Sequence, residues 1–177
     1  MPNIVYIAAS LDGYIADRNG GLDWLHRIPN PETDDYGWNA FIERIDAIVM
    51  GRNTFDIVCG FGGTWPYPCP VYVWSSSLES VPEEYAGKAL LIRGSVDAVL
   101  AQVQADGHST LYIDGGRTVQ SFLREDVIDE LIVTRIPVLL GGGAPLFGDL
   151  PAELWFEHVE TKVFGNALVQ SRYQRTR

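Results

Sequence analysis

Short runs of consecutive apolar residues recur through the first two thirds of the chain, separated by polar and turn-forming stretches. Their length suits a strand better than a helix, and an unbroken apolar run is typical of a strand covered on both faces of a sheet. We therefore predict buried strands at Ile4–Ala9, Ile48–Met50, Val71–Trp74, Ala89–Ile92 and Leu111–Ile113.

Between some of these runs the apolar positions follow a helical period. The spacing i, i+3, i+4, i+7 places four side chains on one face of a helix. It occurs at Trp38, Phe41, Ile42 and Ile45, and again at Val96, Val99, Leu100 and Val103. Ser95 is placed to cap the second of these helices and Gly107 to end it. A third, short helix after Gly116 would bury Val119, Phe122 and Leu123.

The last third of the chain has the pattern of antiparallel strands. Leu131–Leu140 is a strand-like run broken by Pro137, and Trp155–Phe164 alternates loosely. Gly165-Asn166 is a hairpin turn signal before Ala167–Tyr173. The whole pattern predicts an α/β fold with a mostly parallel sheet flanked by helices and an antiparallel C-terminal hairpin. No linker or repeat divides the chain, so we expect one domain over residues 1–177.

Composition and charge exclude several classes of protein. The chain is 46% hydrophobic, which is too apolar for disorder, and its formal charge of −10 argues against nucleic-acid binding. The first apolar run is too short for a signal sequence or a membrane span. Cys59 and Cys69 make no disulfide framework, so we expect a cytoplasmic protein. The three histidines show no metal-ligand spacing, and we expect no metal.

Three predicted strands end in small or glycine-rich turns. Gly51 precedes Arg52–Thr54, where free N–H groups and the arginine would form an anion site; the alternative is an ordinary helix start with an exposed arginine. Gly115-Gly116 repeats the strand–glycine–helix order but lacks the Rossmann and P-loop patterns, so a tight structural turn explains it equally well. Ser75–Ser77 offers hydroxyls to a ribose or phosphate, or is only a polar turn. We interpret Gly141–Gly143 as a bent loop.

The occurrence of these turns together favours a dinucleotide ligand. The carboxyl ends of parallel strands lie along one edge of an open α/β sheet, where ligands bind. Two strand–glycine–helix turns and a serine turn on that edge suit an elongated molecule with separated phosphates. Local N–H donors and arginines would have to outweigh the overall negative charge.

Four motifs occur in an order known from one superfamily. They are Ile7-Ala8-Ala9-Ser10-Leu11-Asp12-Gly13-Tyr14-Ile15-Ala16, Met50-Gly51-Arg52-Asn53-Thr54-Phe55, Val73-Trp74-Ser75-Ser76 and Ile113-Asp114-Gly115-Gly116-Arg117. With them the sequence resembles the dihydrofolate reductase-like superfamily. It is most similar to the branch of the reductase domain of the bifunctional riboflavin-biosynthesis deaminase/reductase. Pro137–Gly143 and Leu146-Phe147-Gly148 look like that branch too, so the resemblance spans the chain.

The resemblance implies bound NADPH. Ala8 and Ile15 would contact the nicotinamide carboxamide through backbone groups. Gly51, Arg52, Asn53 and Thr54 would hold the phosphates, with Arg52 on the 2′-phosphate. Ser75 and Ser76 would flank the adenosine with Arg93 nearby, and the pyrophosphate would lie against Gly115, Gly116, Arg117, Thr118 and Val119. The resemblance also implies a homodimer, whereas we interpret Asp12 as structural.

The substrate side departs from the family pattern. Dihydrofolate reductases of the family carry a carboxylate on the helix before the Met-Gly-Arg motif, and here Asp35 is the candidate, out of register by about two residues. The alternative is that Asp34 and Asp35 cap that helix. Trp24, Tyr36 and Trp65 are candidate substrate walls, or else half-buried aromatic residues.

The resemblance therefore implies an NADPH-dependent reductase that transfers hydride to a C=N or C=O of a small heterocyclic substrate. Two alternatives stay open: a catalytically silent NADP(H)-binding protein, and a pyrimidine reductase of riboflavin biosynthesis. The folate enzymes hold a glutamate carboxylate with an arginine, but residues 53–92 contain none. We expect a smaller or uncharged substrate, stacked against Trp65 or Trp24.

Overall fold

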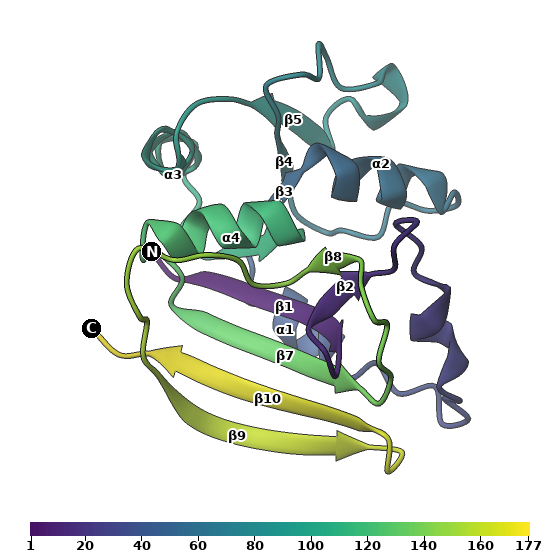
Figure 1. Cartoon of the computed structure of the whole chain (residues 1–177). Coiled ribbons are helices and arrows are strands. Elements are labelled where there is room, and N and C mark those ends of the chain that lie inside the picture. The colour runs from purple at the N-terminus through teal and green to yellow at the C-terminus, as the bar shows by residue number, and fades with distance from the viewer.

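An eight-stranded sheet runs through the whole structure, a computed structural model that describes residues 1–177 (Figure 1). Its strands are β1 (Asn3–Ser10), β3 (Ala47–Gly51), β4 (Val71–Trp74), β5 (Ala89–Ile92), β6 (Leu111–Asp114), β7 (Glu130–Ile136), β9 (Phe156–Phe164) and β10 (Leu168–Arg175). Their order is β5-β4-β3-β6-β1-β7-β10-β9. The six strands from β5 to β7 are parallel, β10 is antiparallel to β7, and β9 is antiparallel to β10. The predicted architecture is confirmed.

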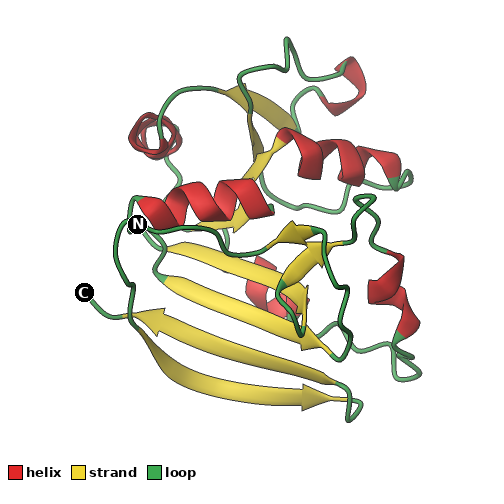
Figure 2. Cartoon of the chain, in the orientation of Figure 1, coloured by secondary structure: helices red, strands yellow, loops and turns green.

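Helices cover both faces of the parallel part of the sheet. They are α1 (Trp38–Ile42), α2 (Arg52–Gly60), α3 (Val96–Ala105) and α4 (Gly116–Arg124). Alternate residues of β3 point to opposite faces, so Val49 packs with residues of α3 and α4, whereas Ile48 packs with Phe41 of α1 and Phe55 of α2. Figure 2 shows α1 behind the sheet and α4 in front of it. All five predicted strands of the first two thirds form.

The C-terminal hairpin forms as the sequence predicts. Gly165 and Asn166 have φ of 57° and 54°, and two positive φ values in a row are the backbone of the two-residue turn that matches strand twist. The strand that begins at Glu130 ends at Ile136, immediately before Pro137, whose ring cannot donate to a sheet ladder.

Three local features differ from the sequence predictions. The helix at Trp38 ends at Ile42, because the next turn has the tighter i to i+3 hydrogen bonds, from Arg44 N to Phe41 O and from Ile45 N to Ile42 O. Ile45 is nevertheless buried, as its position in the helical period predicts. Leu90 is 47% exposed in the edge strand β5, although Ala89 and Ile92, on opposite faces of that strand, are both buried. A small second sheet pairs β2 (Tyr14–Ala16) with β8 (Ala144–Pro145). No helix has the length and apolar character needed to cross a bilayer.

Candidate functional site

Two helix N-termini meet at the carboxyl edge of neighbouring strands. Helix α2 begins directly after Gly51 at the end of β3, and α4 begins after Gly115 at the end of β6. A Cβ on Gly51 would lie 3.1 Å from Thr118 Oγ1, and a Cβ on Gly115 would overlap Thr54 Oγ1. The first turns of the two helices are therefore in contact, and the structure brings both glycine motifs into one place.

Neither of these N-termini is capped by a side chain. Helices α2 and α4 have no side-chain hydrogen bond at their N-caps, Gly51 and Gly115. By contrast, Ser95 caps α3, where its Oγ accepts from Ala98 N at 3.3 Å. The free N–H groups of a first turn and the positive end of the helix dipole attract anions. This pair of helix starts is suited to phosphate groups.

Two arginines border the serine turn after β4. Arg52 Nη1 donates to Ser77 Oγ at 3.2 Å, and Arg93 Nη2 donates to the backbone oxygen of Leu78 at 2.7 Å. Ser75 is buried, and its Oγ accepts from the N–H groups of Ser77 and Leu78, as in a polar turn. Ser76 is exposed beside it. Arg52 Nε also lies 3.4 Å from Asp56 Oδ2 in an exposed ion pair, so a ligand that binds this guanidinium from solvent competes with Asp56 and Ser77.

The second glycine of the pair lies against the small sheet. A Cβ on Gly116 would lie 2.9 Å from Ile15 Cδ1 and 3.1 Å from the backbone oxygen of Pro145. Ile15 therefore reaches the N-terminus of α4, and Ala8 is half-buried in β1; their contact with a nicotinamide stays a prediction. Val119, like Ser75 and Thr118, is a buried member of the predicted cofactor set. Its side chain is fully buried, and its N–H donates to the oxygen of Gly115.

The remaining cofactor candidates divide by exposure. Asn53 and Arg117 are exposed in the first turns of α2 and α4, where they can reach a ligand. Thr118 is buried, and its hydroxyl faces Gly51. The polar side chains at the two helix starts therefore comprise the exposed Arg52, Asn53 and Arg117, the half-buried Thr54 and the buried Thr118.

Asp12 hydrogen-bonds to the start of the glycine-rich loop of residues 141–143. Its carboxylate accepts from Ser10 Oγ at 2.6 Å and from the N–H groups of Leu140 and Gly141 at 3.1 and 2.8 Å. The hydroxyl of Ser10 and these N–H groups lower the pKa of Asp12. The structural interpretation of Asp12 is confirmed, through contacts across the fold as well as within its own turn.

A partly buried carboxylate, Asp114, lies at the end of β6 directly before the glycine pair. Its Oδ1 accepts from Gly115 N at 2.8 Å, whereas the neighbouring hydroxyl of Tyr112 donates to the backbone oxygen of Tyr6 at 3.0 Å. Burial raises the pKa of Asp114 to about 6. Asp114 stands within one of the four sequence motifs, but its position in the sequence alone predicts no role for it. The available signal was a carboxylate placed directly after an apolar strand at the ligand-binding edge.

Aromatic side chains connect Asp114 to α1. The charge of Asp114 contributes to the raised pKa of Tyr67, although burial of that phenol is the larger cause. The Trp38 ring lies 6.4 Å from the ring of Tyr67 and 6.0 Å from that of Tyr112. A flat, partly apolar molecule beside Asp114 would therefore have aromatic neighbours on this face of the sheet.

Asp35 lies in the exposed turn before α1. Its carboxylate accepts from Gly37 N at 2.9 Å and Asn39 N at 3.0 Å, and these bonds lower its pKa. Asp34 Oδ1 likewise accepts from Tyr36 N at 2.7 Å. The bond from Asn39 N matches the capping alternative for Asp35, whereas Asp34 bonds only within the turn before the helix. A carboxyl with a lowered pKa carries little proton near neutral pH, so the catalytic role of Asp35 stays a prediction with weaker geometry than that of Asp114.

The three predicted substrate walls do not converge. Trp24 is 5% exposed and packs with Ile136 and Leu168, and Tyr36 is half-buried in the same cluster. Trp65 belongs to another cluster, where its ring lies 5.5 Å from that of Tyr67. Of the three, only Trp65 is linked to the surroundings of Asp114. No group of three His, Cys, Asp or Glu side chains is arranged to hold a metal ion.

The comparisons with known proteins agree with this geometry. The sequence model described as the RibD C-terminal domain matches residues 3–170. A crystal structure from Shewanella sp. PV-4, of a protein whose name assigns it to riboflavin biosynthesis, is 51% identical, covers 100% of both chains and has a TM-score of 0.97.

More distant structures share the fold. A diaminohydroxyphosphoribosylaminopyrimidine deaminase/5-amino-6-(5-phosphoribosylamino)uracil reductase from Thermotoga maritima is 17% identical with a TM-score of 0.72, over 99% of this chain and 56% of that one. Dihydrofolate reductase from Enterococcus faecalis, complexed with NADP(H), is 19% identical with a TM-score of 0.67, over 99% of this chain and 97% of that one. The protein thus has a dihydrofolate reductase-like fold, and it belongs to the RibD C-terminal domain family.

Proposed function

We propose that this chain is an NADPH-dependent reductase that transfers hydride to a C=N or C=O of a small heterocyclic substrate, in the cytoplasm. The observation that carries the proposal is the contact between two uncapped helix N-termini, at Gly51 and Gly115. Free first-turn N–H groups at the carboxyl edge of a parallel sheet are a recurrent phosphate site. Their pairing suits a pyrophosphate, the centre of a dinucleotide.

The 2′-phosphate of NADPH has a candidate partner in Arg52. Its guanidinium already reaches Ser77 on the serine turn, and Arg93 borders the same turn. Both side chains are exposed, so an incoming phosphate does not have to displace a buried ion pair. The Enterococcus faecalis relative in fold was solved with NADP(H), which supports the same cofactor class here.

We assign the proton chemistry to Asp114. Bound NADPH would supply the hydride, and the carbonyl or imine would also have to gain a proton. A carboxyl with a pKa of about 6 is protonated in a useful fraction of molecules near neutral pH. Tyr67, Tyr112 and Trp38 provide the aromatic surroundings for a planar ring. We therefore propose Asp114, and not Asp35, as the proton donor.

A pyrimidine reductase of riboflavin biosynthesis is the second candidate, favoured by the similarity to the Shewanella protein. A ribose phosphate on that substrate needs basic partners, yet Lys88 is the only basic residue between positions 53 and 92. We therefore favour an uncharged heterocycle.

The homodimer implied by the resemblance stays a prediction. An open apolar groove of about 420 Å³, lined in part by Phe147, Trp155 and Tyr173, lies on the sheet face opposite α1 and is a candidate surface for such a dimer.

The experiment that tests the proposal separates binding from turnover. NADPH and NADH are titrated into the purified chain by calorimetry, and NADPH oxidation is then followed with a panel of cyclic imines and cyclic ketones. We expect tight binding of NADPH and turnover of at least one uncharged heterocycle. Absence of NADPH binding would contradict the whole proposal. If NADPH binds but neither a panel member nor the pyrimidine substrate of riboflavin biosynthesis is reduced, the catalytically silent alternative would be favoured.

A further inference from the structure

The small second sheet forms an arm that borders the proposed cofactor site. This β2–β8 arm consists of Tyr14–Ala16 paired with Ala144–Pro145, and it lies beside the N-terminus of α4 (Figure 1). A Cβ on Gly116 would lie 2.9 Å from Ile15 Cδ1 in one strand of the arm and 3.1 Å from the oxygen of Pro145 in the other. The position of the arm therefore sets how much space is open in front of the glycine pair.

Asp12 joins the two segments that lead into the arm. It stands in the turn between β1 and β2, and its carboxylate accepts from the N–H groups of Leu140 and Gly141 in the loop between β7 and β8, at 3.1 and 2.8 Å. Ser10 Oγ donates to the same carboxylate at 2.6 Å and accepts from Tyr14 N at 2.9 Å. One acidic side chain thus connects the end of β1, the start of β2 and the loop before β8.

The backbone contacts within the arm depend on the alignment of the same two segments. Leu146 N donates to the oxygen of Gly13 at 2.9 Å. A Cβ on Gly143 would overlap the oxygen of Ala16, so the loop before β8 passes directly against β2. Contacts as close as these are lost when one segment moves relative to the other.

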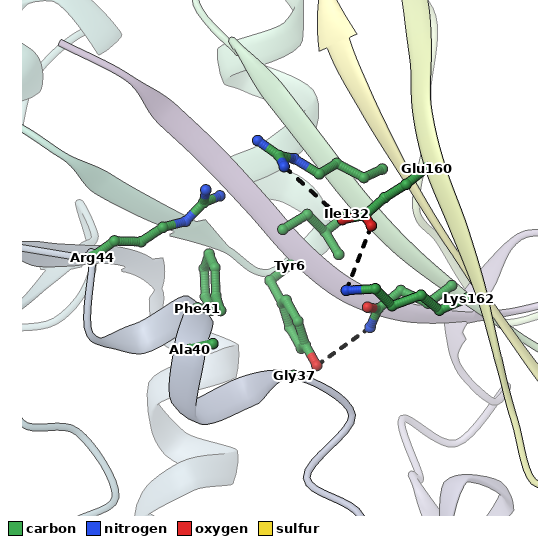
Figure 3. Close-up of a pocket in the computed structure, with 10 residues that line it drawn as sticks. Tyr6, Gly37, Ala40, Phe41, Arg44, Ile132, Glu160 and Lys162 are labelled. Atoms are coloured by element: carbon green, nitrogen blue, oxygen red, sulfur yellow. Dashed lines mark hydrogen bonds and ion pairs between the residues drawn. The ribbon is translucent and has the colours of Figure 1, made fainter.

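On the other face of the sheet, α1 is held by contacts in which Asp12 takes no part. The ring of Phe41 stacks on that of Tyr6, with centroids 4.7 Å apart (Figure 3). Arg44, which follows α1, pairs with the buried Glu130 of β7. Asp12 itself is exposed, so its truncation to alanine leaves no cavity in the core. We therefore expect a substitution of Asp12 to act on the arm while the protein stays folded.

We propose that Asp12 is a positioning residue for the nicotinamide half of the cofactor, because it keeps the β2–β8 arm at the distance from Gly116 that the dinucleotide requires. The inference rests on the proposed NADPH-dependent function. The adenosine half would be held by Arg52 and Arg93, at the ends of β3 and β5, and β6 lies between these strands and β1. Loss of Asp12 should therefore weaken binding of the whole dinucleotide and not of its adenosine half.

Calorimetric titrations with NADPH and with adenosine 2′,5′-bisphosphate, which lacks the nicotinamide half, test the proposal. Asp12→Ala should weaken NADPH binding about tenfold, the size of one charge-assisted hydrogen bond, and leave binding of the bisphosphate unchanged. Asp46→Ala is the matched control, because Asp46 Oδ2 also accepts three bonds, from Ser109 N, Ser109 Oγ and Thr110 N. Asp46 lies at the amino ends of β3 and β6, so this variant should bind both ligands as the wild type does.

The outcomes separate this inference from the proposed function. Unchanged NADPH binding by Asp12→Ala would overturn the role of Asp12 and leave the cofactor assignment in place. Equal weakening of NADPH and the bisphosphate would also overturn it, since the effect would then be a general structural one. A wild-type protein that binds neither ligand would overturn the proposed function and this inference with it.

Amide hydrogen exchange of the ligand-free protein gives a readout that needs no cofactor. The N–H of Leu146 bonds to Gly13 and not to Asp12, so it reports on the arm as a whole. Its exchange should be faster in Asp12→Ala, because local opening of the arm exposes it. The N–H of Val99, which bonds to Ser95 in α3, should exchange as in the wild type. Unchanged exchange at Leu146 would show that the arm keeps its position without Asp12 and would overturn the proposal.

Discussion

The hydroxyl oxygen of Thr54 occupies the space that a Cβ on Gly115 would need. Gly115 also has a φ of +89°, a backbone conformation that side-chain-bearing residues rarely adopt. The first turns of α2 and α4 can therefore approach each other only because this position carries no side chain. That approach places two sets of free N–H groups side by side, which is the basis of the proposed pyrophosphate site.

Replacement of Gly115 by alanine should abolish NADPH binding. Gly107→Ala is the matched control, because Gly107 has a φ of +94° but nothing within 4 Å of its Cβ position. Both variants should lose stability because of their positive φ, and Gly115→Ala should lose more because its Cβ overlaps Thr54 Oγ1. Only Gly115→Ala should also lose binding, measured by calorimetric titration with urea unfolding in parallel. Normal NADPH binding by a folded Gly115→Ala protein would show that the turn has no role in the site.

Truncation of Arg52 should remove the preference for NADPH over NADH. A charge-assisted hydrogen bond to the 2′-phosphate contributes about 1.5–3 kcal/mol, so Arg52→Ala should weaken NADPH binding by about ten- to 150-fold and leave NADH binding nearly unchanged. Arg124→Ala is the control, since Arg124 is exposed in the last turn of α4. Equal affinities of the wild type for both cofactors would contradict the assignment of Arg52.

Most strands were predictable from sequence because they are unbroken apolar runs, and α1 and α3 because their apolar positions follow a helical period. The strand pair β2 and β8 was not, since two or three residues carry no period. The glycine turns were found from their position between strand and helix. The importance of Asp114 could not be derived in that way, because its raised pKa results from burial, which only the fold produces. The packing of Trp24 into the core likewise depends on distant residues, Ile136 and Leu168.

Dihydrofolate should be a poor substrate. Its glutamate carboxylate needs a basic partner, but Lys88 is the only basic residue between positions 53 and 92. Loss of such a charged partner corresponds to roughly 100-fold in affinity. Dihydrofolate-dependent oxidation of NADPH by the purified protein should therefore be slow, with an apparent KM well above the micromolar range. Efficient turnover at micromolar dihydrofolate would require a carboxylate anchor from another part of the chain.

Asp114→Asn should lower the turnover of whichever heterocycle is reduced, by roughly 10²–10⁴-fold, the usual contribution of general acid catalysis. Because the protonated carboxyl would be the donor, the wild-type rate should fall as pH rises above about 6. The variant should lose this dependence. Asp35→Asn serves as the comparison: an asparagine can still cap α1, so this variant should retain activity. The reverse pattern would restore Asp35 as the proton donor.

The free energy of unfolding should depend on the ionisation of Asp114 even without ligand. Its pKa rises from 3.8 to about 6 on folding, so the native state binds this proton more tightly than the unfolded state does. The resulting stabilisation is fully present below pH 3.8 and is lost as pH rises through about 6. Asp114→Asn stays neutral throughout and keeps an acceptor for Gly115 N. Between pH 4 and pH 7, urea unfolding should therefore show the stability of the variant rising relative to wild type by roughly 1–3 kcal/mol. A stability difference that does not change with pH would show that Asp114 is ionised at its ordinary pKa, and would also remove the basis for its role as proton donor.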